Sequence, residues 1–442
     1  MVLSVKSPEA NWILRMRGIL VSLSLTCYFL YFNWGSLGVH FALDDLGNIA
    51  HYYNLRQKQL LLSQFLLWRG DYRPLGALFY LPIYHLAGLN PVPYQAVLLI
   101  LNLVNVFLVY RFALVLGAGA TAAFIAGLVI CCHSGMANLY YNAAFVFDVL
   151  CVLFYLATFL YYLRIRKNNR LLLAHEKAIT LGLFVCALNS KEMAVTLPIM
   201  FFIYEWLSNP PPDFRSVSKW LWGPGQLGLL TGVLSGLSTL GKITGPTAMI
   251  ASEAYKPVFS AERLHAFYQL YFQDVFLSWQ RLPGWTEILF VWVVLVGIAL
   301  FRPKPLVTRF LVCWLFVVPI PIQFLPGKRA ACLALMMIAW AILASVALVG
   351  ATNAFVRLGQ ACRISIAISR YLGVLIVVAL VFLWAREQRY LQREFIRGSM
   401  ASLGFETWDL IQQFPHIPRP RSGSRVAFVG SPIPKIDMYF LA

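Results

Sequence analysis

Among the ionisable side chains that border or interrupt the apolar runs of this sequence, eight are candidates for chemistry. Asp44 and Asp45 stand together after the first run, and Asp148 lies near the start of a later one. The other candidates are Arg73, Lys191, Glu192, Lys328 and Arg329. Lys and Arg hold phosphate groups, and an aspartate can take the proton from an incoming hydroxyl. Carboxylates and cations at a lipid–water boundary therefore indicate chemistry on a phosphate that is attached to a lipid.

Each of these residues also has a purely structural interpretation. The aspartate pair could cap a helix or lie in solvent, and Arg73 could extend toward lipid headgroups. Asp148 could pair with a basic neighbour for packing alone, and Lys191 and Glu192 could satisfy each other. The late pair of cations could anchor the chain at the interface. Function is favoured because all of them are expected on one side of a membrane, where ionisable groups are rare and costly.

The composition requires lipid as the main solvent of this chain. Its 442 residues are 60% hydrophobic and 12% charged, whereas a soluble domain is about 45–50% apolar and about 25% charged. Soluble, disordered and coiled-coil classes are thereby excluded. The net charge of +18 is then explained by cytoplasmic loops and anionic headgroups. No nucleic-acid partner is expected.

About eleven apolar runs predict membrane-crossing helices, since a span takes about 20 residues. They lie near residues 18–34, 93–116, 120–138, 143–163, 178–190, 194–207, 219–240, 285–301, 308–325, 329–350 and 371–385. Arg15 and Arg17 precede the first run, and a dense basic loop occupies 164–170. Both place the N-terminus inside. The predicted fold is an all-α polytopic membrane protein with about 11 transmembrane helices.

The first outer loop, residues 35–90, is too long to be a simple connection. Between 46 and 67 its apolar residues recur at helical spacing, which predicts an amphipathic helix lying in the membrane interface. The stretch 75–89 is apolar but short and contains Pro82. We expect that stretch to form a helix that does not cross the membrane.

Two further segments are predicted outside the membrane. The large outer loop, 241–285, has an apolar stripe at helical spacing from Leu264 to Phe276. The tail contains a short predicted strand at 425–430. We therefore expect one transmembrane domain over residues 1–385 and a short extracytoplasmic tail over 386–442.

The sequence leaves metal dependence open. The eight cysteines show no CxxC pattern and no Cys/His ligand spacing, so structural zinc and disulfides are not expected. No cofactor is required by the pattern. The pair of Asp44 and Asp45 could hold Mg²⁺ or Mn²⁺, although Arg and Lys could neutralise a phosphate without a metal.

Several motifs occur in an order that resembles the polytopic GT-C superfamily of glycosyltransferases. They are the acidic pair after the first span, Arg73-Pro74-Leu75, the turn at 88–94, Asn102 with Asn105, Ser190-Lys191-Glu192, and a late proline-rich turn ending in Arg329. The likeness covers about residues 10–350. It is nearest to the protein O-mannosyltransferases, the aminoarabinose transferases of lipid A and the O-mannosyltransferases that carry TPR repeats.

This resemblance implies a GT-C-like arrangement and a sugar donor carried on polyprenyl phosphate. One of Asp44 and Asp45 would be the general base that deprotonates an acceptor hydroxyl, with Asp44 favoured. The leaving phosphate would be bound by cations drawn from Arg73, Lys191, Lys328 and Arg329. Asp148 and Glu192 would orient those cations or bind sugar hydroxyls. The active site would face the periplasm of a bacterial inner membrane or, alternatively, the ER lumen.

The sequence departs from the family pattern after Arg329, where Ala330-Ala331-Cys332 replaces the tyrosines and proline that often follow. The tail is also shorter than the outer domain of several relatives. The sugar and the acceptor, whether glycan, lipid or protein, stay open. The alternative function is a polyprenyl-lipid flippase or a lipid-phosphate-binding membrane protein without catalysis.

Overall fold

The computed structural model describes residues 8–41, 44–167, 169–245, 253–276, 282–301, 305–326, 333–397, 408 and 411–412. Over these residues the chain is helical, and they contain no strand. The α-helices are α1 (Pro8–Asn33), α2 (Asp45–Tyr53), α3 (Gln57–Phe65), α4 (Ala77–Ala87), α5 (Pro91–Leu116), α6 (Ala120–Cys132), α7 (Ala137–Tyr141), α8 (Val146–Arg166), α9 (Ala174–Ser190), α10 (Leu197–Ser208), α11 (Val217–Trp222), α12 (Gln226–Thr244), α13 (Ala261–Phe276), α14 (Trp285–Phe301), α15 (Pro305–Val317), α16 (Ile320–Gln323), α17 (Ala334–Ala361) and α18 (Ile366–Phe395). Short 3₁₀ helices include η1 (Trp34–Gly38), η2 (Leu67–Arg69), η3 (Pro74–Gly76), η4 (Ser134–Met136), η5 (Ala143–Phe145), η6 (Glu192–Thr196), η7 (Phe214–Ser216) and η9 (Glu253–Tyr255).

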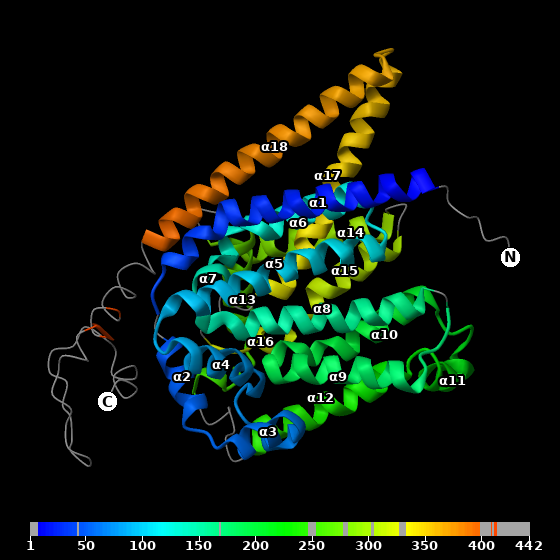
Figure 1. Cartoon of the computed structure of the whole chain (residues 1–442). Helices are drawn as coiled ribbons and strands as arrows, with labels where there is room; N and C mark the ends of the chain where they lie inside the picture. The colour runs from blue at the N-terminus through cyan, green and yellow to red at the C-terminus, as the bar shows by residue number, and fades with distance from the viewer. Residues whose placement is uncertain are drawn as a thin grey trace.

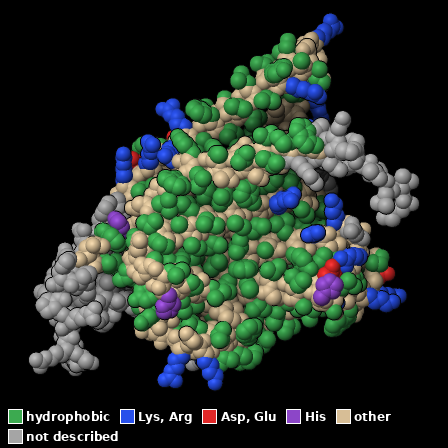
Figure 2. Space-filling view, in the orientation of Figure 1, with side chains coloured by type: hydrophobic (Ala, Val, Ile, Leu, Met, Phe, Trp, Pro, Cys, Tyr) green, Lys and Arg blue, Asp and Glu red, His purple; other side chains and the backbone are tan. Residues whose placement is uncertain are grey.

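The helix lengths agree with a multi-pass membrane protein. Seven helices of the described chain are long and apolar enough to cross a bilayer, or eight if the bent pair of α6 with η4–α7 forms one span. Each of the eleven predicted runs contains helix. Among them α9, α10 and α14 have 17, 12 and 17 residues. Hydrophobic side chains cover most of the face seen in Figure 2, as contact with lipid requires.

The helices α8, α9, α10 and α12 run side by side, so each of them has one terminus toward either end of the bundle (Figure 1). One end carries α2, α4 and α7, and we call it the site end. The start of α1 and α11 lie toward the opposite end. The first outer loop therefore lies close to where α9 ends and where η6 begins.

The first outer loop forms three short helices. The expected helix between 46 and 67 is divided into α2 and α3, with Arg56 in extended conformation between them. The stretch around Pro82 forms α4, which has 11 residues and is too short to cross a bilayer, as predicted. In the large outer loop the predicted stripe is confirmed: α13 buries Phe267, Tyr271 and Val275.

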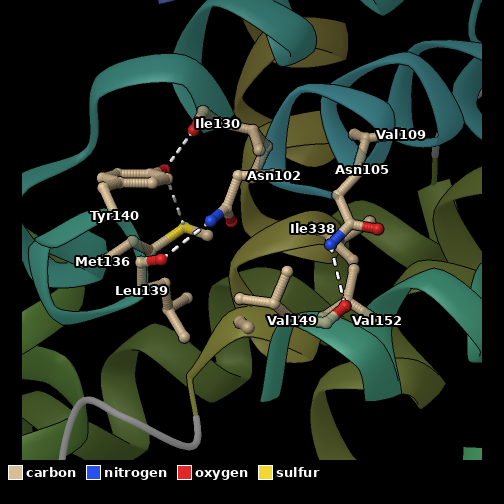
Figure 3. A pocket seen from close by; sticks show the side chains of 11 residues that line it. Asn102, Asn105, Val109, Ile130, Met136, Leu139, Tyr140, Val149, Val152 and Ile338 are labelled. Atoms are coloured by element: carbon tan, nitrogen blue, oxygen red, sulfur yellow. Dashed lines mark hydrogen bonds between the residues drawn. The ribbon is translucent and has the colours of Figure 1, made fainter. Parts of the chain in front are cut away.

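Asparagine side chains join helices inside the bundle. Asn102 donates to the carbonyl of Leu139 (2.7 Å), and Asn105 donates to that of Val149 (2.9 Å). Figure 3 shows both beside a cavity of about 10 Å³, which is room for about one water molecule. Bonds of this kind satisfy polar groups where lipid cannot. The two asparagines of the family-like motif thus hold α5 against α7 and α8.

The bend of 56° between α6 and α7 leaves backbone groups that need partners. The C-terminal turns of α18 supply them: Gln388 accepts from the backbone N–H of Ser134 (2.8 Å), and Gln392 donates to the carbonyl of Cys132 (3.1 Å). This helix continues to Phe395, so the predicted domain boundary at 385 falls inside it. The predicted strand at 425–430 lies outside the described residues.

Candidate functional site

One carboxylate at the site end holds two cations from distant parts of the chain. Nη2 of Arg73 lies 3.1 Å from Oε2 of Glu192, and Nζ of Lys242 lies 3.4 Å from Oε1 of the same carboxylate. Arg73 precedes η3, Glu192 opens η6, and Lys242 lies in the last turns of α12. Three segments therefore meet at Glu192.

Arg73 is held in a demanding backbone conformation. Its φ of 38° and ψ of 59° are left-handed, a region that costs free energy for a residue other than glycine. The hydroxyl of Tyr52 donates to its carbonyl oxygen at 2.8 Å. The rings of Tyr72 and Phe147 lie 4.8 and 5.1 Å from its guanidinium carbon, within range of cation–π attraction. The surrounding contacts thus fix where the guanidinium points.

The guanidinium of Arg73 is almost fully enclosed, with 7% of the residue exposed. It donates to Glu192 and also to the hydroxyls of Tyr72 (2.9 Å) and Tyr255 (3.2 Å). Burial alone would lower the pKa of Arg73, but the carboxylate of Glu192 raises it above its usual range. Burial raises the pKa of Tyr72 to about 12, although the nearby cation opposes this. The arginine is therefore a permanent cation and Tyr72 a neutral phenol.

A second ion pair lies next to the first. Nζ of Lys191 is 2.5 Å from Oδ2 of Asp148, and both side chains are buried. Asp148 is in the first turn of α8, where the helix dipole favours negative charge. Lys191 ends α9 in extended conformation and is followed directly by Glu192. We call Arg73, Lys191 and Lys242, with the carboxylates Asp148 and Glu192, the cation cluster. Three cations against two carboxylates leave one net positive charge.

Asp44 and Asp45 differ sharply in environment. Asp44 is exposed and occupies the N-cap position of α2, but its side chain makes no capping hydrogen bond. Asp45, the first residue of that helix, is fully buried. The structural interpretation as a capping aspartate is therefore wrong for Asp44. The exposed carboxylate can meet a substrate directly, whereas the buried one acts on its protein surroundings.

Two tyrosines, Tyr52 in α2 and Tyr80 in α4, connect α2 to the cation cluster. The rings of Tyr52 and Tyr80 stack with centroids 5.8 Å apart, and Tyr80 donates to the carbonyl of Ala143 at 3.1 Å. Burial raises the pKa of Tyr80 above its usual range, and the charge of Asp45 adds to this. The hydroxyl of Tyr52 also donates to the carbonyl of Arg73. The stacked rings of Tyr52 and Tyr80, which we call the aromatic wall, therefore connect α2 to the cation cluster.

Glycines permit the close approach that brings Lys242 to the cluster. A Cβ atom on Gly241 would lie 2.5 Å from the carbonyl oxygen of Leu67, and one on Gly70 would overlap the carbonyl of Gly241. The loop after α3 therefore packs backbone to backbone against the end of α12. This contact requires glycine on both sides.

Gly241→Ala should separate these segments and displace Lys242. We expect the unfolding free energy to fall by about 1–3 kcal/mol, as for other overpacked contacts, measured by thermal denaturation in detergent. Gly236→Ala on the same helix is the control, because a Cβ there meets nothing within 4 Å and alanine favours helix. Equal stability of the two variants would contradict the close approach.

Acid should weaken the cluster through Glu192. Burial would raise the pKa of this carboxyl, but Arg73 and Lys242 hold it below its usual range. Its contribution to stability is therefore fully present above the unfolded pKa of about 4.3 and is lost as the pH falls through the lower folded pKa. We expect the melting temperature of the wild type to fall more between about pH 6 and pH 3 than that of Glu192→Gln. An equal fall in melting temperature for the wild type and Glu192→Gln would contradict the lowered pKa of Glu192.

The structure brings together four of the predicted site residues: Arg73, Lys191, Glu192 and Asp148. Asp44 and Asp45 lie on the adjoining helix, while Lys328 and Arg329 lie outside the described residues. Lys242, Tyr72 and Tyr255 also belong to this site but are not among the residues predicted from the sequence. A lysine at the outer end of a predicted span was the available signal for Lys242; nothing in the local pattern marks the two tyrosines.

Within the described part of the chain, no three His, Cys, Asp or Glu side chains are grouped to hold a metal ion. The carboxylates of the cation cluster are both engaged by cations. The arrangement can bind an anion with Arg and Lys and can offer a carboxylate to a proton.

No protein-family model and no curated protein matches the sequence. Among solved structures, the chain is similar to the crystal structure of ArnT from Cupriavidus metallidurans bound to undecaprenyl phosphate, with a TM-score of 0.45 and 16% sequence identity. The match covers 93% of this chain and 81% of that one. Because the TM-score and the sequence identity are both low, we base the functional proposal on the contacts of this chain's own residues.

Proposed function

We propose that this protein is a membrane glycosyltransferase. It moves a sugar from a polyprenyl-phosphate-linked donor to an acceptor hydroxyl or amine, with inversion at the anomeric carbon. The reaction takes place at the extracytoplasmic face, which we assign to the periplasmic side of a bacterial inner membrane. The observation that carries the proposal is the convergence of Arg73, Lys191 and Lys242 beside a helix whose N-cap residue is an exposed aspartate.

The cation cluster suits the leaving group of such a donor. When the bond between the anomeric carbon and the phosphate oxygen breaks, its electron pair stays on the phosphate. Fixed cations in a water-poor site stabilise charge that develops in this way. Arg73 presents a planar fork of donors, and Lys191 and Lys242 add point charges. Lys328 and Arg329 are proposed as further phosphate ligands on the strength of the sequence alone.

Asp44 is proposed as the general base. Its exposed carboxylate takes the proton from the acceptor while the acceptor oxygen attacks the anomeric carbon opposite the phosphate. Asp45 is buried, and its charge acts on Tyr80 of the aromatic wall. We propose that Asp45 holds α2 in place. Asp148 and Glu192 orient the cations, as their ion pairs indicate.

Sugar release from a radiolabelled polyprenyl-phosphate donor, with the protein in nanodiscs, tests the proposal. We expect Asp44→Asn to lower transfer by about 10²–10⁴-fold, the usual contribution of a general base, while donor binding persists. Asp45→Asn should also lower transfer, with a loss of thermal stability that Asp44→Asn does not show.

The matched control is Asp213→Asn, which changes an exposed carboxylate in the cap of η7 near α11 and leaves a residue that can still cap. It should transfer sugar as the wild type does. Donor binding without sugar release, unchanged in both aspartate variants, would overturn the transferase and support the flippase or lipid-binding alternative. Full transfer by Asp44→Asn would remove this residue as the base.

A further inference from the structure

The segment formed by α3 and η2 presents apolar side chains outward along one face. Leu61 is 66% exposed, Phe65 is 76% exposed and Trp68 is 55% exposed. Leu61 and Phe65 are four residues apart and therefore lie on the same side of α3, and Trp68 follows in η2. Such a face on a short helix is unfavourable in water, so it requires an apolar neighbour.

The opposite side of the same segment is fastened to the candidate site. Leu60, Ser63 and Leu67 are buried. The side-chain amide of Gln64 donates to the backbone carbonyl of Pro74 at 2.6 Å, and the backbone carbonyl of Gln64 accepts from the side chain of Asn189 at 2.7 Å. Pro74 follows Arg73 directly, and Asn189 lies two residues before Lys191. Gln64 therefore contacts two segments that contribute to the cation cluster, the one with Arg73 and the one with Lys191.

The position of this segment indicates what covers its apolar face. The 3₁₀ turn η2 packs on the last turns of α12, which is long and apolar enough to span a membrane. Figure 1 shows α3 beside that end of α12, at the outside of the bundle. Leu240 and Ile243 in the same turns of α12 are exposed as well. The face of α3 therefore continues the exposed apolar surface of a helix that is long and apolar enough to span a membrane.

The polar residues of the segment suit the same neighbour. Arg56 and Lys58 are exposed at the start of α3, where they can meet lipid phosphates. Tryptophan is enriched at the boundary between headgroups and acyl chains, and Trp68 lies at the far end of the apolar face. A cationic start and an aromatic apolar face are typical of a helix seated in a membrane interface.

We propose that α3 and η2 are seated in the lipid leaflet at the site end, and that Gln64 couples this seating to the cation cluster. The partner is the phospholipid surface itself. Contact with the leaflet holds α3 and η2 at the depth of the headgroups. Gln64 then aligns the segments that carry Arg73 and Lys191 for binding a phosphate that is attached to a lipid. The lipid contact is independent of the proposed transferase; only the choice of a lipid phosphate as the cluster's ligand rests on it.

Fluorescence quenching by lipids brominated near the headgroup tests the seating. We expect the wild type in nanodiscs to lose more emission than Trp68→Phe does, because the difference between them reports Trp68 alone. Changing both Leu61 and Phe65 to glutamate should abolish that difference. Equal quenching of the wild type and Trp68→Phe would overturn the proposal.

Binding of polyprenyl phosphate without a sugar tests the coupling and requires no transfer activity. Gln64→Met removes the side-chain bond to Pro74; it should keep the Trp68 quenching but bind the lipid phosphate at least about threefold more weakly. The Leu61→Glu, Phe65→Glu double variant should also bind more weakly. Phe214→Glu, which changes an exposed phenylalanine in η7, is the control and should match the wild type. Unchanged binding by Gln64→Met would overturn the coupling, whereas a wild type that binds lipid phosphate but releases no sugar would count against the transferase alone.

Discussion

Arg73→Gln should abolish sugar transfer and destabilise the protein. The substitution leaves Glu192 enclosed with Lys242 as its remaining ion-pair partner among the described contacts. Breaking a buried ion pair from one side costs about 3–5 kcal/mol. Because the side chain of Glu192 is 23% exposed and keeps Lys242, we expect a loss at the lower end of that range. Arg73→Lys should not restore transfer, because an ammonium cannot make the forked contact to Glu192, Tyr72 and Tyr255. Thermal denaturation and donor turnover measure the two effects.

A double variant separates stability from chemistry in this pair. Arg73→Gln with Glu192→Gln removes both charges, so the melting temperature should recover most of what Arg73→Gln loses. Transfer should stay absent, since the leaving phosphate has lost its cation. If the double variant regained transfer, Arg73 would serve packing alone.

Lys191→Met should have an effect of similar size. It leaves the carboxylate of Asp148 buried in the first turn of α8, so we again expect a loss of about 3–5 kcal/mol. Replacing both partners, with Asp148→Leu added, should restore stability because well-packed apolar residues often substitute for a buried ion pair without loss. Binding of polyprenyl phosphate should stay weak in the single and the double variant, since both lack the lysine.

The pair of Arg166 and Glu205 is the matched control. Nη2 of Arg166 lies 2.7 Å from Oε2 of Glu205, both are buried, and the pair joins α8 to α10. Arg166→Met should destabilise the protein as Lys191→Met does but should leave binding of the lipid phosphate unchanged below the melting temperature. Equal loss of binding in both variants would show that destabilisation alone accounts for the result at Lys191.

Much of the fold follows from local patterns. The apolar runs predict helices because a chain in lipid must satisfy its backbone within each segment. Pro82 and the short stretch around it predict a helix that does not cross, and α4 has that form. The stripe on α13 is buried as its spacing predicts, since helical periodicity is a property of neighbouring residues.

Some features of the same elements needed the folded chain. The helix expected between 46 and 67 is interrupted at Arg56, because α2 packs on α4 while α3 packs on α9 and η3. The predicted span at 120–138 bends near His133, where side chains from α18 replace the missing helical hydrogen bonds. Neither partner is close in sequence.

The sequence by itself determined that this is a helical membrane protein, and it predicted the candidate site residues on one side of the membrane. It also singled out Asp44, Arg73, Lys191 and Glu192 by residue type. Only the tertiary structure decided that Asp44 is exposed while Asp45 is buried, and that Lys242 shares Glu192 with Arg73. The physical reason is that helix formation and membrane partitioning depend on neighbouring residues. Ion pairing and burial instead depend on contacts across the chain, such as the 119 residues that separate Arg73 from Glu192.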